Sequence, residues 1–143
     1  MAPRPSHRPY VLDEQIGFIL RQVVQRHVAI FDGLMDGDLT PTQWAALSKL
    51  AEVGTCSQNQ LGRLTAMDVA TIKGVIDRLS ARGLTKTSAD PDDGRRLLVT
   101  LTPAGRERVD QAVSGAFQAT EDTLAPLTAA ERETLKSLLF KLK

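Results

Sequence analysis

The sequence predicts a mainly α-helical fold of the α+β class, with six helical segments and one β-hairpin. Three observations predict it. Apolar residues recur at steps of three and four over most of the 143 residues, which is the period of an amphipathic helix. Two short β-prone runs flank a turn of aspartate, proline and glycine. Prolines, glycines and capping residues separate the remaining segments.

The N-terminal part predicts an arm and two helices. Residues 1–10 contain three prolines, and we expect them to form an extended arm. One long amphipathic helix is predicted over residues 13–32. A second begins after Thr40, which is followed by proline and, three residues on, by Gln43, the pattern of a capping box. Gly54 ends this helix. Its apolar stripe is Trp44, Leu47, Leu50 and Ala51.

Two short helices joined by a tight turn come next, and a hairpin follows them. The helices are predicted over residues 57–64 and 68–82, with Ser57 and Asp68 as their N-caps. The strands are predicted at residues 84–88 and 97–102. The second helix should bury Ile72, Val75, Ile76 and Leu79. This order indicates a winged helix-turn-helix.

The last two helices begin at Pro103 and Thr128. Together with the first helix, they carry more apolar surface than a winged region of about 70 residues can cover. A second copy of the chain would bury it, so we expect a homodimer. Residues 11–36 and 103–143 are therefore predicted to form a dimerisation region. Residues 37–102 would form the DNA-binding region of a single intertwined domain.

The charge distribution favours DNA as the partner. The formal net charge is only +1, but residues 57–106 hold eight Lys or Arg against five Asp or Glu. In a helix-turn-helix the second helix lies in the major groove, and small residues on its exposed face allow a close approach. The first helix offers free N–H groups to a phosphate. The residues expected to contact DNA are Ser57, Gln58, Gln60, Ala70, Thr71, Lys73, Gly74, Arg78, Arg95 and Arg96.

The two adjacent arginines at the hairpin tip call for separate roles. Alternation along a strand would send Arg95 and Arg96 to opposite faces. One would pair with Asp90 or Asp93 and brace the turn, and the other would enter the adjacent minor groove. The residues do not indicate which arginine does which. The competing interpretations are two solvated arginines and, for the helix, a solvated face with a packing glycine.

The hairpin also carries a family signature. Asp93-Gly94-Arg95 is followed by five residues and then by Leu101-Thr102, after which "PAGRE" starts the next helix. With "LTPTQWAALSKL" and "VIDRLSARGL" in the preceding helices, the chain resembles the MarR family of winged-helix regulators over about residues 12–142. The resemblance implies a homodimer that binds a pseudo-palindromic operator, usually as a repressor. Many members release DNA when a small phenolic or aromatic carboxylate binds.

A ligand pocket is predicted between the first two helices, which we expect to be antiparallel neighbours. Aromatic walls beside a cationic group suit an aromatic carboxylate. The residues expected to line the pocket are Arg21, His27, Phe31 and Trp44. His27 has a competing interpretation as a satisfied core or interface residue.

Other classes of protein receive little support. His7 and His27 lie twenty residues apart and Cys56 is the single cysteine, so we expect no metal, no cofactor and a bystander thiol. Neither histidine has a nucleophile nearby in sequence and no glycine-rich phosphate loop is present, so we expect no enzyme. The alternative function is a winged-helix protein-interaction module without DNA or ligand binding.

The sequence has no apolar run near 20 residues and "MAPRPSHRPY" is no secretory signal, so we expect a cytoplasmic protein without membrane contact.

Overall fold

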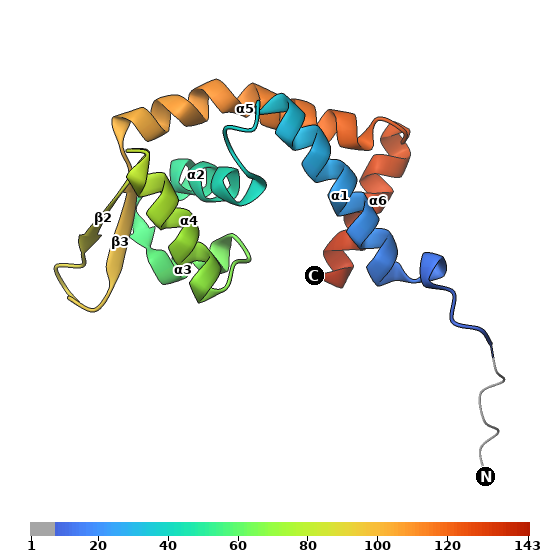
Figure 1. Ribbon diagram of the computed structural model, residues 1–143, viewed down its shortest axis with the longest axis horizontal. Coiled ribbons are helices and arrows are strands. Elements are labelled where there is room, and N and C mark those ends of the chain that lie inside the picture. The colour runs from blue at the N-terminus through green and yellow to red at the C-terminus, as the bar shows by residue number, and fades with distance from the viewer. Residues whose placement is uncertain (1–7) are drawn as a thin grey trace, which may run out of the picture.

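The computed structural model of the chain describes residues 8–143, which form six α-helices and one small antiparallel sheet (Figure 1). The elements in chain order are a 3₁₀ turn η1 (Leu12–Glu14), α1 (Ile16–Leu34), α2 (Pro41–Val53), β1 (Cys56–Ser57), α3 (Gln58–Leu64), α4 (Val69–Ala81), β2 (Thr85–Ala89), β3 (Leu97–Leu101), α5 (Pro103–Leu124) and α6 (Ala129–Leu142). This is the mainly α-helical winged helix-turn-helix that the sequence predicts.

Local capping chemistry starts the helices where it was predicted to. Thr40 and Gln43 form a complete capping box at α2, and Thr128 forms another at α6. The side chain of Ser57 accepts a hydrogen bond from the backbone N–H of Gln60 at 3.2 Å and caps α3. Gly54 follows α2 with φ of 78°, a left-handed value that favours glycine. The predicted boundaries of these helices are therefore confirmed.

The N-terminus differs from the prediction. The long first helix does not run continuously from residue 13, because η1 ends at Glu14 and Gln15 has an extended backbone before α1 begins. Of the predicted arm, residues 1–7 lie outside the described residues. Residues 8–10 are exposed and irregular.

The sheet has the order β1-β3-β2, and both pairs are antiparallel. The hairpin register pairs Thr87 with Val99, and its strands lie within one residue of the predicted bounds. The strand β1 was not predicted. Its two residues have no strand pattern of their own and pair through Cys56 with Val99. This third strand joins the start of α3 to the hairpin.

Most of the core lies within one lobe, and residues at the end of α1 and along α5 complete it. We call residues 39–101, which comprise α2, α3, α4 and the sheet, the winged lobe. The fully buried large side chains all belong to it: Leu39, Leu47, Leu50, Leu61, Ile72, Ile76, Leu79 and Val99. Trp44, predicted to be buried, is only half-buried and packs against the edge of this core. The winged lobe is therefore a packed unit within the chain.

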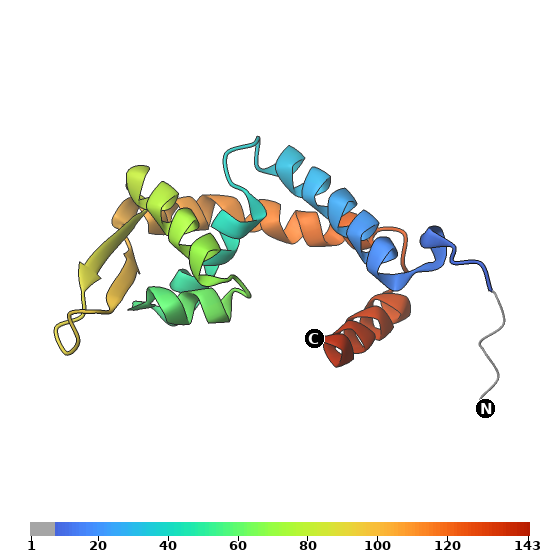
Figure 2. The same ribbon diagram turned by 60° about the horizontal axis from the view of Figure 1, so that its bottom comes forward.

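The helix α5 is the spine of the molecule, with the winged lobe at one end and α1 and α6 at the other (Figures 1 and 2). The helix α1 packs along α5, and α2 packs on the opposite end of α5. The expectation that the first two helices are antiparallel neighbours is wrong, because each uses α5 as its partner. In the view of Figure 1 the helix α6 overlaps α1, but the view of Figure 2 shows that the two helices lie apart.

The helices outside the winged lobe leave apolar side chains in solvent. The helix α6 has no buried residue, and α1 buries only Phe31. The large exposed apolar residues of these helices and of α5 are Ile16, Ile19, Leu20, Val23, Val24, Val113, Phe117, Leu135, Leu138, Leu139, Phe140 and Leu142. Across residues 8–143, no helix has both the length and the apolar character needed to cross a membrane.

Candidate nucleic-acid interface

The helix α4 turns one face to the core and the other to solvent. Its N-cap Asp68 accepts a hydrogen bond from the backbone N–H of Thr71 at 2.7 Å, which lowers the pKa of the Asp68 carboxyl. The four residues predicted to face inward, Ile72, Val75, Ile76 and Leu79, are all buried. The residues predicted to face outward, Ala70, Thr71, Lys73 and Arg78, are exposed, and Gly74 is half-buried. The predicted orientation of this helix is confirmed.

Two cationic side chains lie along the exposed face of α4. The ammonium of Lys73 is 2.8 Å from the carboxylate of Asp77, and both side chains are more than half exposed, at 65% and 61%. A Cβ at Gly74 would lie 3.3 Å from the guanidinium of Arg78, and no other side chain of the described residues comes within 4 Å of that point. Helix packing therefore does not account for Gly74. Exposed ion pairs contribute little stability, so Lys73 can turn toward another partner.

The tip of the hairpin is a loop and not the start of a strand. We expected Arg95 and Arg96 in a strand, but β3 begins at Leu97, after both. The reason is turn chemistry. The carboxylates of Asp90 and Asp93 each accept a hydrogen bond from the backbone N–H two residues on, at 2.9 and 3.1 Å. The backbone N–H of Asp90 then donates to the carbonyl oxygen of Arg96 at 2.9 Å and closes the loop.

The two arginines have different surroundings. The Nε atom of Arg96 lies 3.9 Å from a carboxylate oxygen of Asp90, at the outer limit of an ion pair. Within residues 8–143, the guanidinium of Arg95 forms no ion pair. Arg96 is therefore the arginine held closer to the turn, and Arg95 is the freer of the two.

The start of α3 and the hairpin tip enclose a shallow hollow of about 150 Å³, which we call the wing hollow. Its lining residues are Ser57, Gln58, Asn59, Arg95, Arg96 and Leu97. Ser57 is buried and its hydroxyl caps the helix, while Gln60 is exposed outside the hollow. Asn59 was missed because nothing in the sequence places it opposite the arginines. Amide and guanidinium donors around one hollow suit a phosphate group.

His27 is held between α1 and α5 by a defined hydrogen bond. Its Nδ1 atom lies 2.7 Å from the hydroxyl oxygen of Thr123, and that hydroxyl donates its one hydrogen to the carbonyl oxygen of Ala119 at 2.7 Å. The hydroxyl must then accept from His27, so Nδ1 carries a hydrogen. The Nε2 atom remains able to accept a hydrogen bond.

The four predicted ligand residues are not gathered around one cavity. Phe31 is 3% exposed within the core, with its ring centroid 6.4 Å from that of His27. Arg21 is exposed on α1. Trp44 lines a different hollow, of about 230 Å³, between α2 and α5. We call it the Trp44 hollow, and its other residues are Val113, Ala116, Phe117 and Thr120. The hollow that Trp44 lines thus lies on α5, and its lining includes none of the other three predicted residues.

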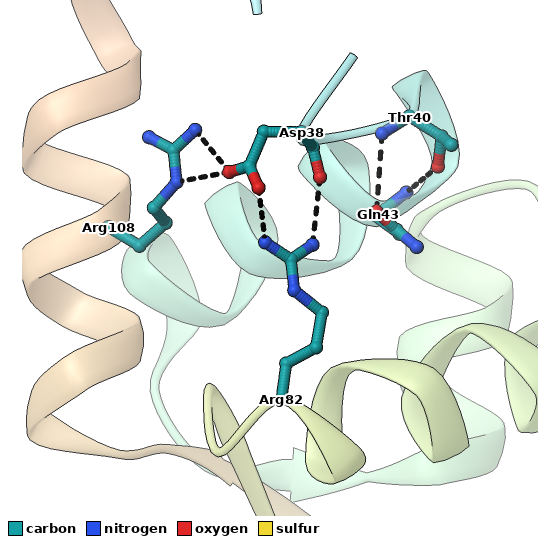
Figure 3. A network of polar contacts seen from close by, with 5 residues as sticks. All are labelled: Asp38, Thr40, Gln43, Arg82 and Arg108. Atoms are coloured by element: carbon teal, nitrogen blue, oxygen red, sulfur yellow. Dashed lines mark hydrogen bonds and ion pairs between the residues drawn. The ribbon is translucent and has the colours of Figure 1, made fainter. Parts of the chain in front are cut away.

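A polar cluster that the sequence did not predict joins three parts of the chain (Figure 3). Asp38, in the loop between α1 and α2, accepts hydrogen bonds from Arg82 at 2.7 Å and from Nε of Arg108 at 2.8 Å. Arg82 also donates to the carbonyl oxygen of Asp38 at 2.8 Å. The hydrogen bond from Arg108 is the main cause that holds the pKa of Asp38 below its usual range. We call these three residues the Asp38 clamp.

The sequence predicts no role for the thiol of Cys56 and no metal site, and the structure shows the surroundings of the residues concerned. Cys56 is buried in β1, and this burial raises the pKa of its thiol. A raised thiol pKa lowers the thiolate fraction and hence the reactivity. Among the described residues, no group of three His, Cys, Asp or Glu side chains is arranged to hold a metal ion. His7 lies outside the described residues.

Comparison with known proteins gives this geometry a context. A sequence model of the MarR family matches residues 37–96. The transcriptional repressor NicR of Pseudomonas putida is 41% identical over 96% of this chain and 87% of its own length. A probable transcriptional regulator from Pseudomonas aeruginosa has a crystal structure that superposes with a TM-score of 0.90, at 59% identity over 93% of this chain and 100% of the other.

A further solved structure is that of BpsR from Bordetella bronchiseptica, whose DNA binding is regulated by 6-hydroxynicotinic acid. It superposes with a TM-score of 0.89, at 46% identity over 94% of this chain and 97% of the other. The element order, the exposed face of α4 and the similarity to these proteins all indicate the same family. The chain therefore belongs to the MarR family of winged helix-turn-helix, DNA-binding transcriptional regulators, and it is not an enzyme.

Proposed function

We propose that this regulator is a homodimeric repressor that releases a pseudo-palindromic operator when a small aromatic carboxylic acid binds. In this proposal residues 37–102 contact the operator, and residues 11–36 and 103–143 hold the two protomers together. The observation that carries the DNA-binding part is the exposed face of α4 beside the arginines of the wing hollow. A recognition helix and an adjacent wing are what a winged helix-turn-helix presents to successive grooves.

The recognition helix would enter the major groove with Ala70, Thr71 and Gly74 nearest the bases. The small side chains at two of these positions let the backbone approach the groove floor. Lys73 would exchange its exposed partner Asp77 for a guanine edge or a phosphate. Arg78, now lying over Gly74, would swing to the phosphate backbone.

The wing would supply one arginine to the minor groove. Arg95 is the better candidate, because Arg96 lies closer to an acid of the turn, at 3.9 Å from Asp90. A narrow minor groove concentrates negative potential, which attracts a free guanidinium. Ser57, Gln58 and Gln60 would contact the phosphates beside the wing hollow, with Ser57 acting through its backbone because its side chain is buried.

Dimerisation would use the exposed apolar stripes of α1 and α6 with the distal part of α5. These stripes include Leu138, which is 52% exposed, and Phe117, which is 72% exposed. Contiguous apolar surface of this kind marks an interface. Sedimentation at micromolar concentration should give about twice the mass of the 15.6 kDa chain, as two-fold symmetric association requires. A folded monomer at that concentration would contradict the homodimer.

The effector would be a hydroxylated pyridine carboxylate or a similar one-ring acid. BpsR, which responds to 6-hydroxynicotinic acid, resembles this chain over nearly its whole length. The Trp44 hollow offers apolar walls for a flat ring. Thr120, which lines it, lies three residues before Thr123, the partner of His27. The Nε2 atom of His27 would then accept a hydrogen bond from the hydroxyl group of such an acid. Arg21 and Phe31 would contribute less, one as an exposed cation and the other as packing behind the His27 ring.

The test measures effector binding and operator release on the same samples. An operator is first selected from random duplex DNA with the full-length protein; failure to enrich any duplex would favour the protein-interaction alternative. Trp44 is the single tryptophan, so its fluorescence reports on the hollow. Titration with 6-hydroxynicotinic acid should change this fluorescence and release the operator over the same concentration range. Only differential affinity for the two conformations can cause release.

Matched variants separate the parts of the site. His27→Phe keeps the ring bulk but removes the polar group, so it should blunt release while operator binding persists. Nicotinic acid, which lacks the hydroxyl, and 4-hydroxybenzoic acid, which lacks the ring nitrogen, test which groups matter. If none of the acids changes either signal, or if His27→Phe responds as the wild type does, the effector assignment is wrong.

A further inference from the structure

The Asp38 clamp lies outside the surfaces assigned to DNA, effector or partner. It joins Arg82 at the C-terminal end of the recognition helix to Arg108 in the spine helix α5 (Figure 3). We propose that Asp38 is a positioning residue for operator binding, which sets the angle between α4 and α5 and thereby the separation of the two recognition helices in a dimer. The inference rests on operator binding by α4, as proposed above.

The recognition helix needs such a link because its packing partners are α2, α3 and β2 rather than α5. The first contact with α5 is made by the residues that directly follow the C-terminal end of α4. The hydroxyl of Thr102 donates to the carbonyl oxygen of Gly83 at 2.6 Å, and a Cβ at Gly105 would overlap the carbonyl oxygen of Leu84. The helix α2 packs on both α4 and α5 and supplies an apolar link between them. The clamp, which reaches α5 one turn further on at Arg108, adds a directional polar link.

The backbone around Asp38 is held by local interactions, while its side chain is 43% exposed. Its backbone N–H donates to the carbonyl oxygen of Met35 at 2.9 Å. The next residue, Leu39, is 0% exposed, and the one after it, Thr40, caps α2. The carboxylate is therefore presented to the two arginines from a fixed stretch of backbone. The lowered pKa of Asp38 agrees with a charged group held by both arginines.

The effect of losing the clamp can be estimated from the geometry of α4. A helix of 13 residues is about 20 Å long, so a rotation of about 10° at its C-terminal end moves its N-terminal end by roughly 3 Å. That displacement is about the rise of one base pair along DNA, roughly 3.4 Å. In a dimer both recognition helices would shift against half-sites spaced about one helical turn apart. The clamp is therefore expected to affect spacing as well as affinity.

The sign of the expected change distinguishes positioning from electrostatics. Removing a negative charge should, by charge alone, strengthen binding to a polyanion. Loss of the clamp should weaken it. We expect Asp38→Asn to bind the selected operator roughly three- to thirtyfold more weakly, the range over which mutations outside a site alter the link between distant sites. The slope of log affinity against log salt should stay as in the wild type, because no phosphate contact is lost.

Asp36→Asn is the matched control. It removes the same charge from the same loop, and Asp36 forms no ion pair within the described residues. Its φ of 52° is left-handed, a conformation that asparagine tolerates. We expect this control to bind the operator as tightly as the wild type or slightly more tightly. Asp38→Glu keeps the charge and should recover part of the affinity.

Two further measurements exclude a merely structural role. Operators with one base pair inserted or deleted at the centre should be discriminated less by Asp38→Asn than by the wild type. Arg108→Gln should weaken binding as well, and the double variant should lose less than the product of the two single losses, because both break one clamp. Circular dichroism confirms that each variant is folded at the assay temperature.

The outcomes separate this inference from the proposed function. A wild-type protein that selects no duplex contradicts operator binding itself. If the wild type binds but Asp38→Asn equals Asp36→Asn in affinity and in spacing discrimination, the clamp has no positioning role. Multiplicative losses in the double variant would also overturn it.

Discussion

The winged lobe and the terminal helices obey the same local rules but differ in what covers their apolar faces. In the lobe, the inward stripe of α4 is buried, and Ile72, Ile76 and Leu79 are each 0% exposed. In α6, Leu138 and Leu142 also follow a helical period, yet they are 52% and 70% exposed. Both stripes look alike in sequence. The difference teaches that periodicity identifies a face without identifying its partner.

The energetic consequence is a division between folding and assembly. The core of the lobe is completed within the same chain, by its own side chains together with Phe31 and buried residues of α5, so we expect its stability to depend little on protein concentration. The exposed stripes of α1 and α6 would gain burial from the second chain of the proposed dimer, so their contribution should grow with concentration. The following predictions are ordered from the largest expected effect to the smallest, and each tests this division.

Truncation inside the lobe should have the largest effect. Leu47 is 0% exposed, and Leu47→Ala removes packing that the surroundings can replace only in part. We expect the free energy of unfolding to fall by about 2–5 kcal/mol, as large-to-small core substitutions do. Urea titration followed by circular dichroism measures it. The loss should be the same at two widely different protein concentrations; a loss that disappears at high concentration would break the comparison.

A charge placed in the stripe of α6 should dissociate the protein without unfolding the lobe. Leu138→Asp puts a carboxylate where the proposed interface excludes water, and burying an unpaired charge costs several kcal/mol. Sedimentation should shift toward 15.6 kDa while Trp44 keeps its folded-state emission. Lys136→Asp is a control on the same helix. If Leu138→Asp stays dimeric, the interface lies elsewhere.

Substitutions on the exposed face of the lobe should weaken DNA binding and leave stability nearly unchanged. Lys73→Ala should cost about 1–3 kcal/mol and relax the preference at one position if it contacts a base. If it contacts a phosphate, all sequences should weaken alike and the salt slope should fall by about one. The thermal midpoint should stay within a few degrees, because the partner Asp77 is exposed. An unchanged affinity and slope would mean that α4 is not the recognition helix.

Substitution of the two arginines at the hairpin tip also tests whether the exposed face of the lobe binds DNA. Arg95→Ala should weaken operator binding more than Arg96→Ala, because Arg96 is nearer to Asp90 and the freer guanidinium is the one available to a groove. Fluorescence anisotropy with labelled operator compares the two. Arg132→Ala removes a cation from the terminal helices, where Arg132 pairs with Glu121 at 2.7 Å, and should not alter the salt slope. If both wing variants bind as the wild type does, the wing makes no DNA contact.

Predictions from sequence succeeded where the cause is local. Thr40 with Gln43, and Thr128 with Glu131, form capping boxes because the partners lie three residues apart. The buried face of α4 followed from spacing alone. The strand β1 could not be predicted, because its two residues are ordered by pairing with Val99, more than forty residues away.

The errors at the candidate site have the same origin. The sequence "DGDLT" indicated only the end of a helix, whereas Asp38 meets arginines 44 and 70 residues further along the chain. The prediction that a strand begins at the hairpin tip is wrong because the carboxylates of Asp90 and Asp93 accept backbone hydrogen bonds that form a loop, while Asp90 also lies 3.9 Å from Arg96. Consecutive helices were assumed to pack together, but α1 and α2 both use α5. Long-range partners carry little signal in a single sequence.

Acid titration of two helix caps should give the smallest effect, and it compares the two regions directly. Backbone hydrogen bonds lower the pKa of Asp68 at the start of α4 and that of Glu131 at the start of α6. A carboxyl whose pKa is lower in the folded state stabilises that state above the unfolded pKa. This contribution is lost as the pH falls through the folded pKa, so it should disappear from about pH 4 downward.

Asp68→Asn keeps a good cap but removes the charge, so it should lower the thermal midpoint by no more than a few degrees near pH 7. The difference from the wild type should shrink as the pH falls below about 4. Because α4 belongs to the lobe core, this difference should not depend on protein concentration. Glu131→Gln makes the equivalent change on a helix without a core, so its effect should appear in the dimer dissociation constant instead. If both variants shift the thermal midpoint equally at every concentration, α6 folds as one unit with the lobe, and the division between folding and assembly does not hold.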